Sequence, residues 1–189
     1  MRRIGIFGGT FDPPHRAHYQ MAQQATALMR LDLLFLVPAW QAPLKNDTPI
    51  ALPAQRAAML DLMAGANKSW QVLTYEIEQA RPVPTIETLE YLMGSQAHAE
   101  YYVIVGKDQA KQIHRWYRWE DLAAKARFLC FAREGDYSFG DDTVFYRKFD
   151  FDSPYSSSGI RQAISEGIDV ESALMPQVYE YINTHGLYR

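Results

Sequence analysis

Two histidines, His15 and His18, lie three residues apart, shortly after the glycine pair Gly8-Gly9. An apolar run from Ile4 to Phe7 precedes the glycines and predicts a short buried strand. Residues three apart share one face of a helix, so we expect both imidazoles on one side of a helix that begins here. Glycines let a ligand approach the backbone closely, and a helix N-terminus attracts anions. Two imidazoles at such an anion site indicate phosphate chemistry.

These residues need a framework, and the rest of the chain predicts one. Strand-like and helix-like segments alternate, which favours one α/β domain over residues 1–189. We expect a Rossmann-like, doubly wound parallel sheet, with helices on both faces and a C-terminal helical segment. Strands are predicted at 3–7, 33–37, 70–75, 101–105, 128–132 and 143–149. Helices are predicted at 16–29, 54–64, 85–93, 107–114, 120–126, 156–166 and 176–185.

Ligands of such sheets bind at the carboxyl ends of the strands, where the strand order reverses. Three segments, 8–18, 38–45 and 106–119, are expected to meet there because each follows a predicted strand. The connection 39–53 is long and holds Pro43 and Pro49. Long connections of this kind are often binding lids.

A serine-rich segment, 156–158, opens a predicted helix and is followed by Arg161. Serine hydroxyls at a helix start either cap the helix or contact a phosphate. An arginine one turn later can hold phosphate oxygens through two parallel N–H donors. When this segment is taken alone, a serine that caps the helix and a solvated arginine explain it as well as a phosphate site does.

The string Gly-Gly-Thr-Phe-Asp-Pro-x-His at residues 8–15 resembles the bacterial nicotinate-nucleotide adenylyltransferases. This family belongs to the His-x-Gly-His nucleotidyltransferases, and Ala17 stands where that signature has glycine. The resemblance extends over residues 4–189 and includes the C-terminal pattern Tyr-Ile-x-x-x-Gly-Leu-Tyr at 181–188. We assign that pattern to packing and not to chemistry.

The resemblance implies an ATP site in which the two histidines hold the phosphates and stabilise the charge that develops. It also implies that serines and an arginine grip the leaving pyrophosphate and that an aspartate orients the ribose or a metal-bound water. The implied catalytic residues are His15, His18 and Arg161. The implied ATP-binding residues are Gly8, Gly9, Thr10, Phe11, His15, His18, Gly106, Asp108, Ser156, Ser158 and Arg161.

The resemblance also implies a site for the acceptor, in which a Trp-Tyr pair clamps a pyridine ring and a threonine at a helix start holds its carboxylate. Thr85 or Thr88 is expected to cap that helix. The lysine of the site either neutralises a phosphate or is a solvated loop residue. Leu44 and Pro84 replace the family's histidine and tyrosine, which leaves the shape of the pyridine pocket open. The implied acceptor residues are Lys45, Thr85, Trp116 and Tyr117.

The implied reaction joins ATP to nicotinate mononucleotide and gives deamido-NAD and pyrophosphate. Mg²⁺ is expected to arrive with ATP, because no spacing of His, Cys, Asp or Glu predicts a protein metal site. Two alternatives stay open. The acceptor is another phosphorylated molecule, such as nicotinamide mononucleotide or phosphopantetheine, or the chain is a nucleotide-sensing module without turnover.

Composition limits the kinds of partner and the cellular location that we expect for this chain. The net charge of −3 gives no reason to expect general nucleic-acid binding. No apolar run approaches the ~20 residues of a membrane span, so we expect no membrane insertion and a cytoplasmic protein. The single cysteine, Cys130, lies in an apolar run and is expected to be a buried core thiol. Both a monomer and a homo-oligomer are compatible with the sequence.

Overall fold

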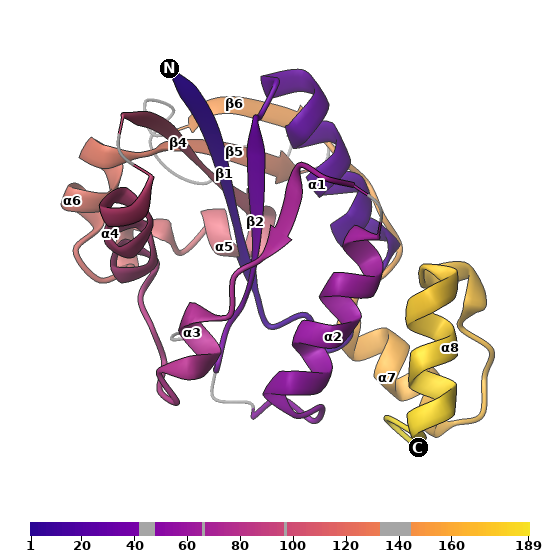
Figure 1. The fold of residues 1–189 in the computed structure, drawn as a ribbon. Helices are drawn as coiled ribbons and strands as arrows, with labels where there is room; N and C mark the ends of the chain where they lie inside the picture. The colour runs from indigo at the N-terminus through magenta and orange to yellow at the C-terminus, as the bar shows by residue number, and fades with distance from the viewer. Residues whose placement is uncertain (42–47, 66, 97, 133–144) are drawn as a thin grey trace.

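The computed structural model describes residues 1–41, 48–65, 67–96, 98–132 and 145–189. Its centre is a six-stranded sheet in the order β3-β2-β1-β4-β5-β6, with every neighbouring pair parallel (Figure 1). The strands are β1 (Arg2–Gly9), β2 (Leu33–Pro38), β3 (Trp70–Val72), β4 (Ala99–Gly106), β5 (Arg127–Ala132) and β6 (Phe145–Asp150).

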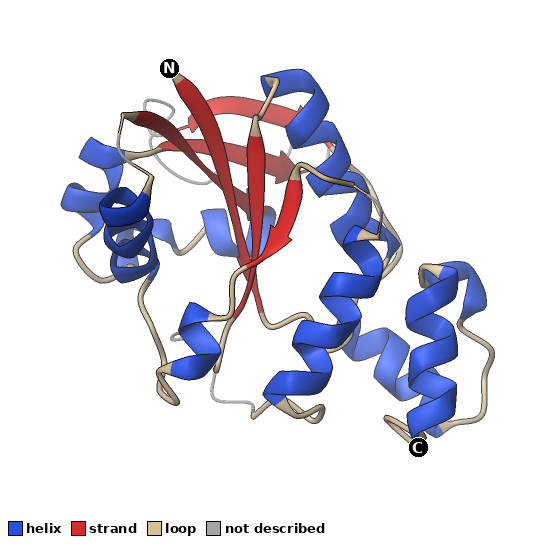
Figure 2. Cartoon of the chain, in the orientation of Figure 1, coloured by secondary structure: helices blue, strands red, loops and turns tan. Residues whose placement is uncertain are grey.

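Helices cover both faces of the sheet (Figure 2). One face carries α1 (Arg16–Met29), α2 (Pro53–Ala64), α7 (Ser157–Ser165) and α8 (Pro176–His185), with the 3₁₀ turn η2 (Glu171–Ala173) between the last two. The other face carries α3 (Tyr75–Glu78), α4 (Thr85–Ser95), α5 (Lys107–Ala110), the 3₁₀ turn η1 (Ile113–Arg115) and α6 (Trp119–Lys125). The predicted Rossmann-like, doubly wound fold with a C-terminal helical segment is confirmed.

The central parts of β1, β2, β4 and β5 are apolar because each face of the sheet packs on its own core. Successive side chains of a strand point to opposite faces. In β4, Tyr102 and Ile104 therefore pack in the cluster that includes α1 and α2, while Tyr101, Val103 and Val105 pack with α4 and α6. Parallel sheets covered on both sides show this pattern.

The predicted bounds lie within two residues of the observed ones except in two places, and positions 143 and 144 of the last predicted strand lie outside the described residues. The helices at 16–29 and 176–185 have the predicted bounds. The strand predicted at 70–75 ends at Val72, because Tyr75 begins α3 and stacks on Tyr91 of α4 with 4.3 Å between ring centroids. The helix predicted at 107–114 divides into α5 and η1, where tighter hydrogen bonds bring Ile113 into the core.

The cysteine prediction is also confirmed. Cys130 lies on β5, is fully buried, and faces the core shared with α4 and α6. Burial raises the pKa of its thiol to about 12, so the reactive thiolate is disfavoured at neutral pH.

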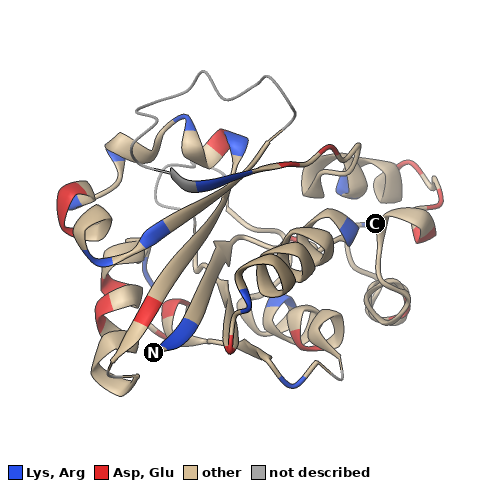
Figure 3. Cartoon of the chain, turned by 90° about the horizontal axis from the view of Figure 1, so that it is seen from above, with Lys and Arg blue, Asp and Glu red and all other residues tan. Residues whose placement is uncertain are grey.

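The surface mixes charges of both signs. Lys and Arg residues are interspersed with Asp and Glu residues over both helical layers (Figure 3). Within the described residues, no helix combines the length and apolar character needed to cross a membrane.

The strand order reverses between β1 and β4. The chain first moves outward from β1 to β2 and β3, and then returns to place β4 on the other side of β1. The connections that leave the carboxyl ends of β1 and β4 therefore run to opposite faces of the sheet. Proteins of this architecture bind ligands in the crevice that results, which makes the ends of these two strands the place to look for a site.

Candidate active site

The two histidines lie at the start of α1, directly beyond the end of β1. His15 is the N-cap of this helix, with an extended backbone, and so directly precedes the predicted first helical residue, Arg16. Its backbone N–H donates to Nδ1 of His18 at 3.2 Å, so a neutral His18 carries its proton on Nε2. The two rings stack with 3.8 Å between their centroids. The two imidazoles therefore lie side by side, as expected, with His15 at the N-cap and His18 in the first turn of the helix.

His15 is a buried imidazole without a counter-charge. Only 5% of it is exposed, and burial lowers its pKa from 6.5 to about 4. Among the described residues, its Nδ1 has no hydrogen-bond partner. The ring is therefore neutral at pH 7 in the ligand-free protein. A phosphate beside it favours the protonated form and raises this pKa.

Phe11 supports the second histidine. Its ring lies 4.9 Å from the ring of His18 and packs edge-on against Phe7. Gly9 makes room for it, because an added Cβ there would lie 3.1 Å from the Phe11 ring. The Phe11 ring is buried, so what this residue offers a nucleotide is its backbone. An added Cβ at Gly8 meets nothing within 4 Å, which is compatible with a ligand close to the backbone.

The serine-rich segment begins α7 by capping it. Ser156 is the N-cap, and its Oγ accepts the backbone N–H of Gly159 at 3.1 Å. Ser158 is exposed, with its Oγ 3.4 Å from that of Ser156. The capping interpretation of Ser156 is therefore correct, and a capping hydroxyl keeps lone pairs and a proton for a further partner.

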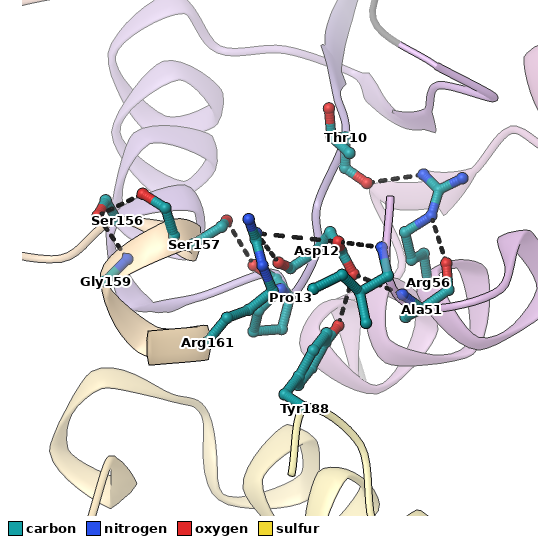
Figure 4. A network of polar contacts seen from close by, with 12 residues as sticks. Thr10, Asp12, Pro13, Ala51, Arg56, Ser156, Ser157, Gly159, Arg161 and Tyr188 are labelled. Atoms are coloured by element: carbon teal, nitrogen blue, oxygen red, sulfur yellow. Dashed lines mark hydrogen bonds and ion pairs between the residues drawn. The ribbon is translucent and has the colours of Figure 1, made fainter. Parts of the chain in front are cut away.

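The start of α7 is docked on the β1–α1 connection (Figure 4). Ser157 Oγ donates to the carbonyl oxygen of Pro13 at 2.9 Å. Arg161 Nη1 donates to the carbonyl oxygen of Asp12 at 2.7 Å. The structure thus brings together two motifs that lie about 150 positions apart in the sequence, and Arg161 is not a freely solvated side chain.

Sequence reasoning missed Arg56, a residue whose side chain also binds the β1–α1 connection. It is a fully buried arginine on α2. Its guanidinium donates to four backbone carbonyls, namely those of Thr10 at 2.7 Å, Ala39 at 2.6 Å, Trp40 at 3.3 Å and Ala51 at 3.3 Å. A charged residue on the apolar side of a predicted helix was the available signal, because such a residue is rarely buried unless it is paired.

The end of β4 reaches the same crevice. Gly106 is the N-cap of α5, and Asp108 lies exposed in its first turn. β4 pairs with β1 up to the register Ile6 to Val103. Gly106 and Asp108 therefore follow the strand beside the one that leads to the histidines, as the sequence predicted for the 106–119 segment.

Thr85, one of the residues assigned to the acceptor, lies on the opposite helical layer, at the start of α4. Thr85 is the first helical residue and is half-buried, while Pro84 is the N-cap. The expected threonine cap is therefore wrong, because the extended Pro84 already starts the helix and no side chain caps it. Thr88, the other candidate, is buried inside α4 and donates to Glu76 Oε1 at 2.6 Å.

The tryptophan–tyrosine pair follows η1. Trp116 packs partly against the core shared with α4 and α6, and Tyr117 is 62% exposed. Arg118, the next residue, pairs with Glu90 of α4 at 2.9 Å, which fastens this turn to the helix that begins at Thr85. Lys45 lies outside the described residues.

Known proteins resemble this chain in sequence and in fold. The family model described as cytidylyltransferase-like matches residues 6–163. A probable nicotinate-nucleotide adenylyltransferase of Synechococcus is 34% identical, over 99% of this chain and 95% of its own length. The one from Bacillus pumilus is 31% identical over 100% of this chain and 99% of its own. The structure of Plasmodium falciparum nicotinic acid mononucleotide adenylyltransferase complexed with NaAD matches with a TM-score of 0.75 and 20% identity, over 100% of this chain and 98% of that one.

Proposed function

The chain belongs to the cytidylyltransferase-like family and, within it, to the nicotinate-nucleotide adenylyltransferases, and we propose that it adenylylates nicotinate mononucleotide with ATP. The products are deamido-NAD and pyrophosphate. The observation that carries this assignment is the docking of α7 on the histidine-bearing connection at the strand switch point. It collects imidazole, hydroxyl and guanidinium groups around one place where a polyphosphate can bind.

The reaction needs no protein nucleophile. The 5′-phosphate of the acceptor is already an anion near neutral pH, and it attacks the α-phosphorus of ATP in line. A new P–O bond forms to the acceptor, and the bond from the α-phosphorus to the bridging oxygen of pyrophosphate breaks. The protein contributes positioning and stabilisation of charge, as in other phosphoryl-group transfers.

Each site residue has a role that fits its surroundings. The Nε2–H of His18 is suited to donate to a phosphate oxygen, because its Nδ1 already accepts the N–H of His15. A polyphosphate beside His15 favours the protonated form of its ring, and that form stabilises negative charge. Arg161 and the hydroxyls of Ser156 and Ser158 hold the leaving pyrophosphate, and Gly8, Gly9 and Thr10 supply backbone and hydroxyl donors.

We infer that the metal enters as part of the substrate, MgATP. In the part of the chain that the structure describes, no three His, Cys, Asp or Glu side chains gather to form a metal site. Mg²⁺ keeps several waters and is commonly held through substrate phosphates. We assign to Asp108, which is exposed at the start of α5, the role of orienting a metal-bound water or the ribose.

The acceptor site favours a carboxylate over a carboxamide. Backbone N–H groups at the start of α4, near Thr85, have no partner within their own helix and attract an anion. A carboxamide would direct its own N–H donors at them, at a cost of about 1–3 kcal/mol for each unpaired group. Trp116 and Tyr117 clamp the pyridine ring, and Lys45 neutralises the mononucleotide phosphate.

The test is pyrophosphate release from MgATP with nicotinate mononucleotide, nicotinamide mononucleotide or phosphopantetheine as the acceptor. We expect kcat/KM for the nicotinate form to exceed that for the nicotinamide form by about tenfold or more, since tenfold corresponds to about 1.4 kcal/mol. Equal values, or a preference for the amide, contradict the assignment of the acceptor. ATP binding without turnover on any acceptor supports a nucleotide-sensing module instead.

A further inference from the structure

The carboxylate of Asp12 is the meeting point of segments from distant parts of the chain. It is 2% exposed and lies in the connection between β1 and α1. Its oxygens accept the backbone N–H groups of Ile50 at 2.8 Å and Ala51 at 3.0 Å, which end the long connection before α2. Arg161 Nη1 lies 3.8 Å from Oδ2, besides its hydrogen bond to the Asp12 carbonyl. Asp12 therefore contacts Arg161 with both its main chain and its side chain.

The fourth partner of Asp12 comes from the C-terminal segment. Tyr188, which is 8% exposed, donates its phenol hydroxyl to Asp12 Oδ1 at 2.8 Å (Figure 4). Burial and the neighbouring carboxylate raise the pKa of this phenol, so it remains a protonated donor at any physiological pH. Its backbone φ of 67° lies in the left-handed region, which is uncommon for a residue other than glycine.

Packing alone does not require this hydroxyl. The Tyr188 ring lies in the core cluster that includes α2 and α8, and a phenylalanine ring would fill the same space. What the hydroxyl adds is a fixed position for the Asp12 carboxylate, and through it for the guanidinium of Arg161. An arginine that holds a phosphate must keep its planar group in one orientation. The C-terminal pattern, assigned to packing on sequence grounds, thus reaches the nucleotide site through one side chain.

We propose that Tyr188 is a positioning residue of the nucleotide site: by fixing Asp12 it holds Arg161 in the orientation that binds ATP phosphates. This inference rests on the proposed function for the identity of the nucleotide. A purely structural role for Tyr188 predicts lower stability with unchanged ATP affinity, and a positioning role predicts weaker ATP binding in the folded protein.

The experiment compares ATP binding to the parent and to Tyr188→Phe by titration calorimetry, which requires no turnover. We expect the Kd for ATP to rise by about fivefold or more, since a hydrogen bond to a charged group is stronger than one between neutral groups and part of its contribution is transmitted to Arg161. KM for ATP should rise in parallel, and KM for the mononucleotide should stay within about twofold.

Tyr179→Phe is the matched control. Tyr179 lies on α8, and its phenol donates to the exposed Asp169 at 3.0 Å, so it loses the same kind of bond away from the site. We expect its ATP affinity to equal that of the parent. A Tyr188→Phe protein that folds and binds ATP as tightly as Tyr179→Phe overturns the inference.

A second comparison tests the route through Arg161. In an Arg161→Ala background, Tyr188→Phe should weaken ATP binding by less than about twofold, because the group that it positions is already gone. An equal loss in both backgrounds contradicts this route. If Tyr188→Phe fails to fold, Asp12→Asn takes its place in the same titrations, with the same expected loss. Absence of turnover in the parent contradicts the proposed function, and the calorimetric comparison still decides the role of Tyr188.

Discussion

The substitution Glu76→Gln should change the free energy of unfolding more favourably at pH 8 than at pH 5. Glu76 lies on α3, is 6% exposed, and accepts the hydroxyl of Thr88 on α4 at 2.6 Å. Burial raises the pKa of Glu76 from 4.5 to about 7, while the hydrogen bond from Thr88 acts in the opposite direction. The buried carboxyl is thus a titrating group between two helices of the layer that carries Thr85.

The sign follows from the proton that each state holds. Between pH 4.5 and about 7, folded Glu76 keeps a proton that the unfolded chain has released, so stability falls as the pH rises. At about 1.4 kcal/mol for each pH unit, this group removes about 2.5 kcal/mol between pH 5 and pH 8. Glutamine has no charge to bury and keeps a carbonyl oxygen for Thr88, so Glu76→Gln lacks this loss.

Urea denaturation followed by tryptophan fluorescence at both pH values measures the effect. The free-energy difference between Glu76→Gln and the parent should move in favour of the variant by about 2.5 kcal/mol from pH 5 to pH 8. Glu78→Gln is the matched control, because Glu78 is exposed on the same short helix. A difference for Glu76→Gln that is the same at both pH values refutes the reasoning.

Three further predictions concern the nucleotide site. His18→Ala should lower kcat by about 100-fold or more and should change the Kd for ATP by a smaller factor. A kcat within a few-fold of that of the parent contradicts the role of His18. Arg161→Ala should weaken the binding of ATP and leave the binding of the mononucleotide unchanged, and Arg161→Lys should restore little of the ATP affinity. Titration calorimetry measures both affinities. Because the pKa of His15 falls from 6.5 to about 4, its contribution to stability is complete above pH 6.5 and is lost as the pH falls towards 4. Between pH 7 and 4.5 this loss is about 2.4 kcal/mol, and His15→Asn should lack it. Urea midpoints at these two pH values that move in parallel in both proteins argue against it.

The fold was predictable because local and global signals agree. The central strands β1, β2, β4 and β5 read as apolar runs, which parallel strands buried on both faces require. The bounds of α1 and α8 are marked by local features, since His15 precedes the first and Gly186 ends the second with a φ of 60°. Besides the division of the helix expected at 107–114, the exception was the strand expected at 70–75. There, the stacking of Tyr75 on Tyr91 decides the structure, and this contact is not visible in a short window of sequence.

The candidate site was predictable only where its residues form motifs. His15, His18, Ser156 and Arg161 stand in local patterns whose residue types indicate phosphate chemistry. The groups that hold those patterns in place have no such signal, because their partners are remote. Arg56 bonds to carbonyls up to 46 positions away, and the hydroxyl of Tyr188 meets a carboxylate 176 positions away. Only the folded chain shows that these side chains serve the same connection.

The β1–α1 connection is ordered before any nucleotide arrives. Arg56 and Arg161 hold its carbonyls at Thr10 and Asp12, and Ser157 holds that of Pro13. Among the described residues, the buried side-chain atom that these bonds leave without a partner is Nδ1 of His15. A connection already fixed by the protein leaves little ordering to be done on binding, which is how preorganisation gives affinity and a reactive geometry together.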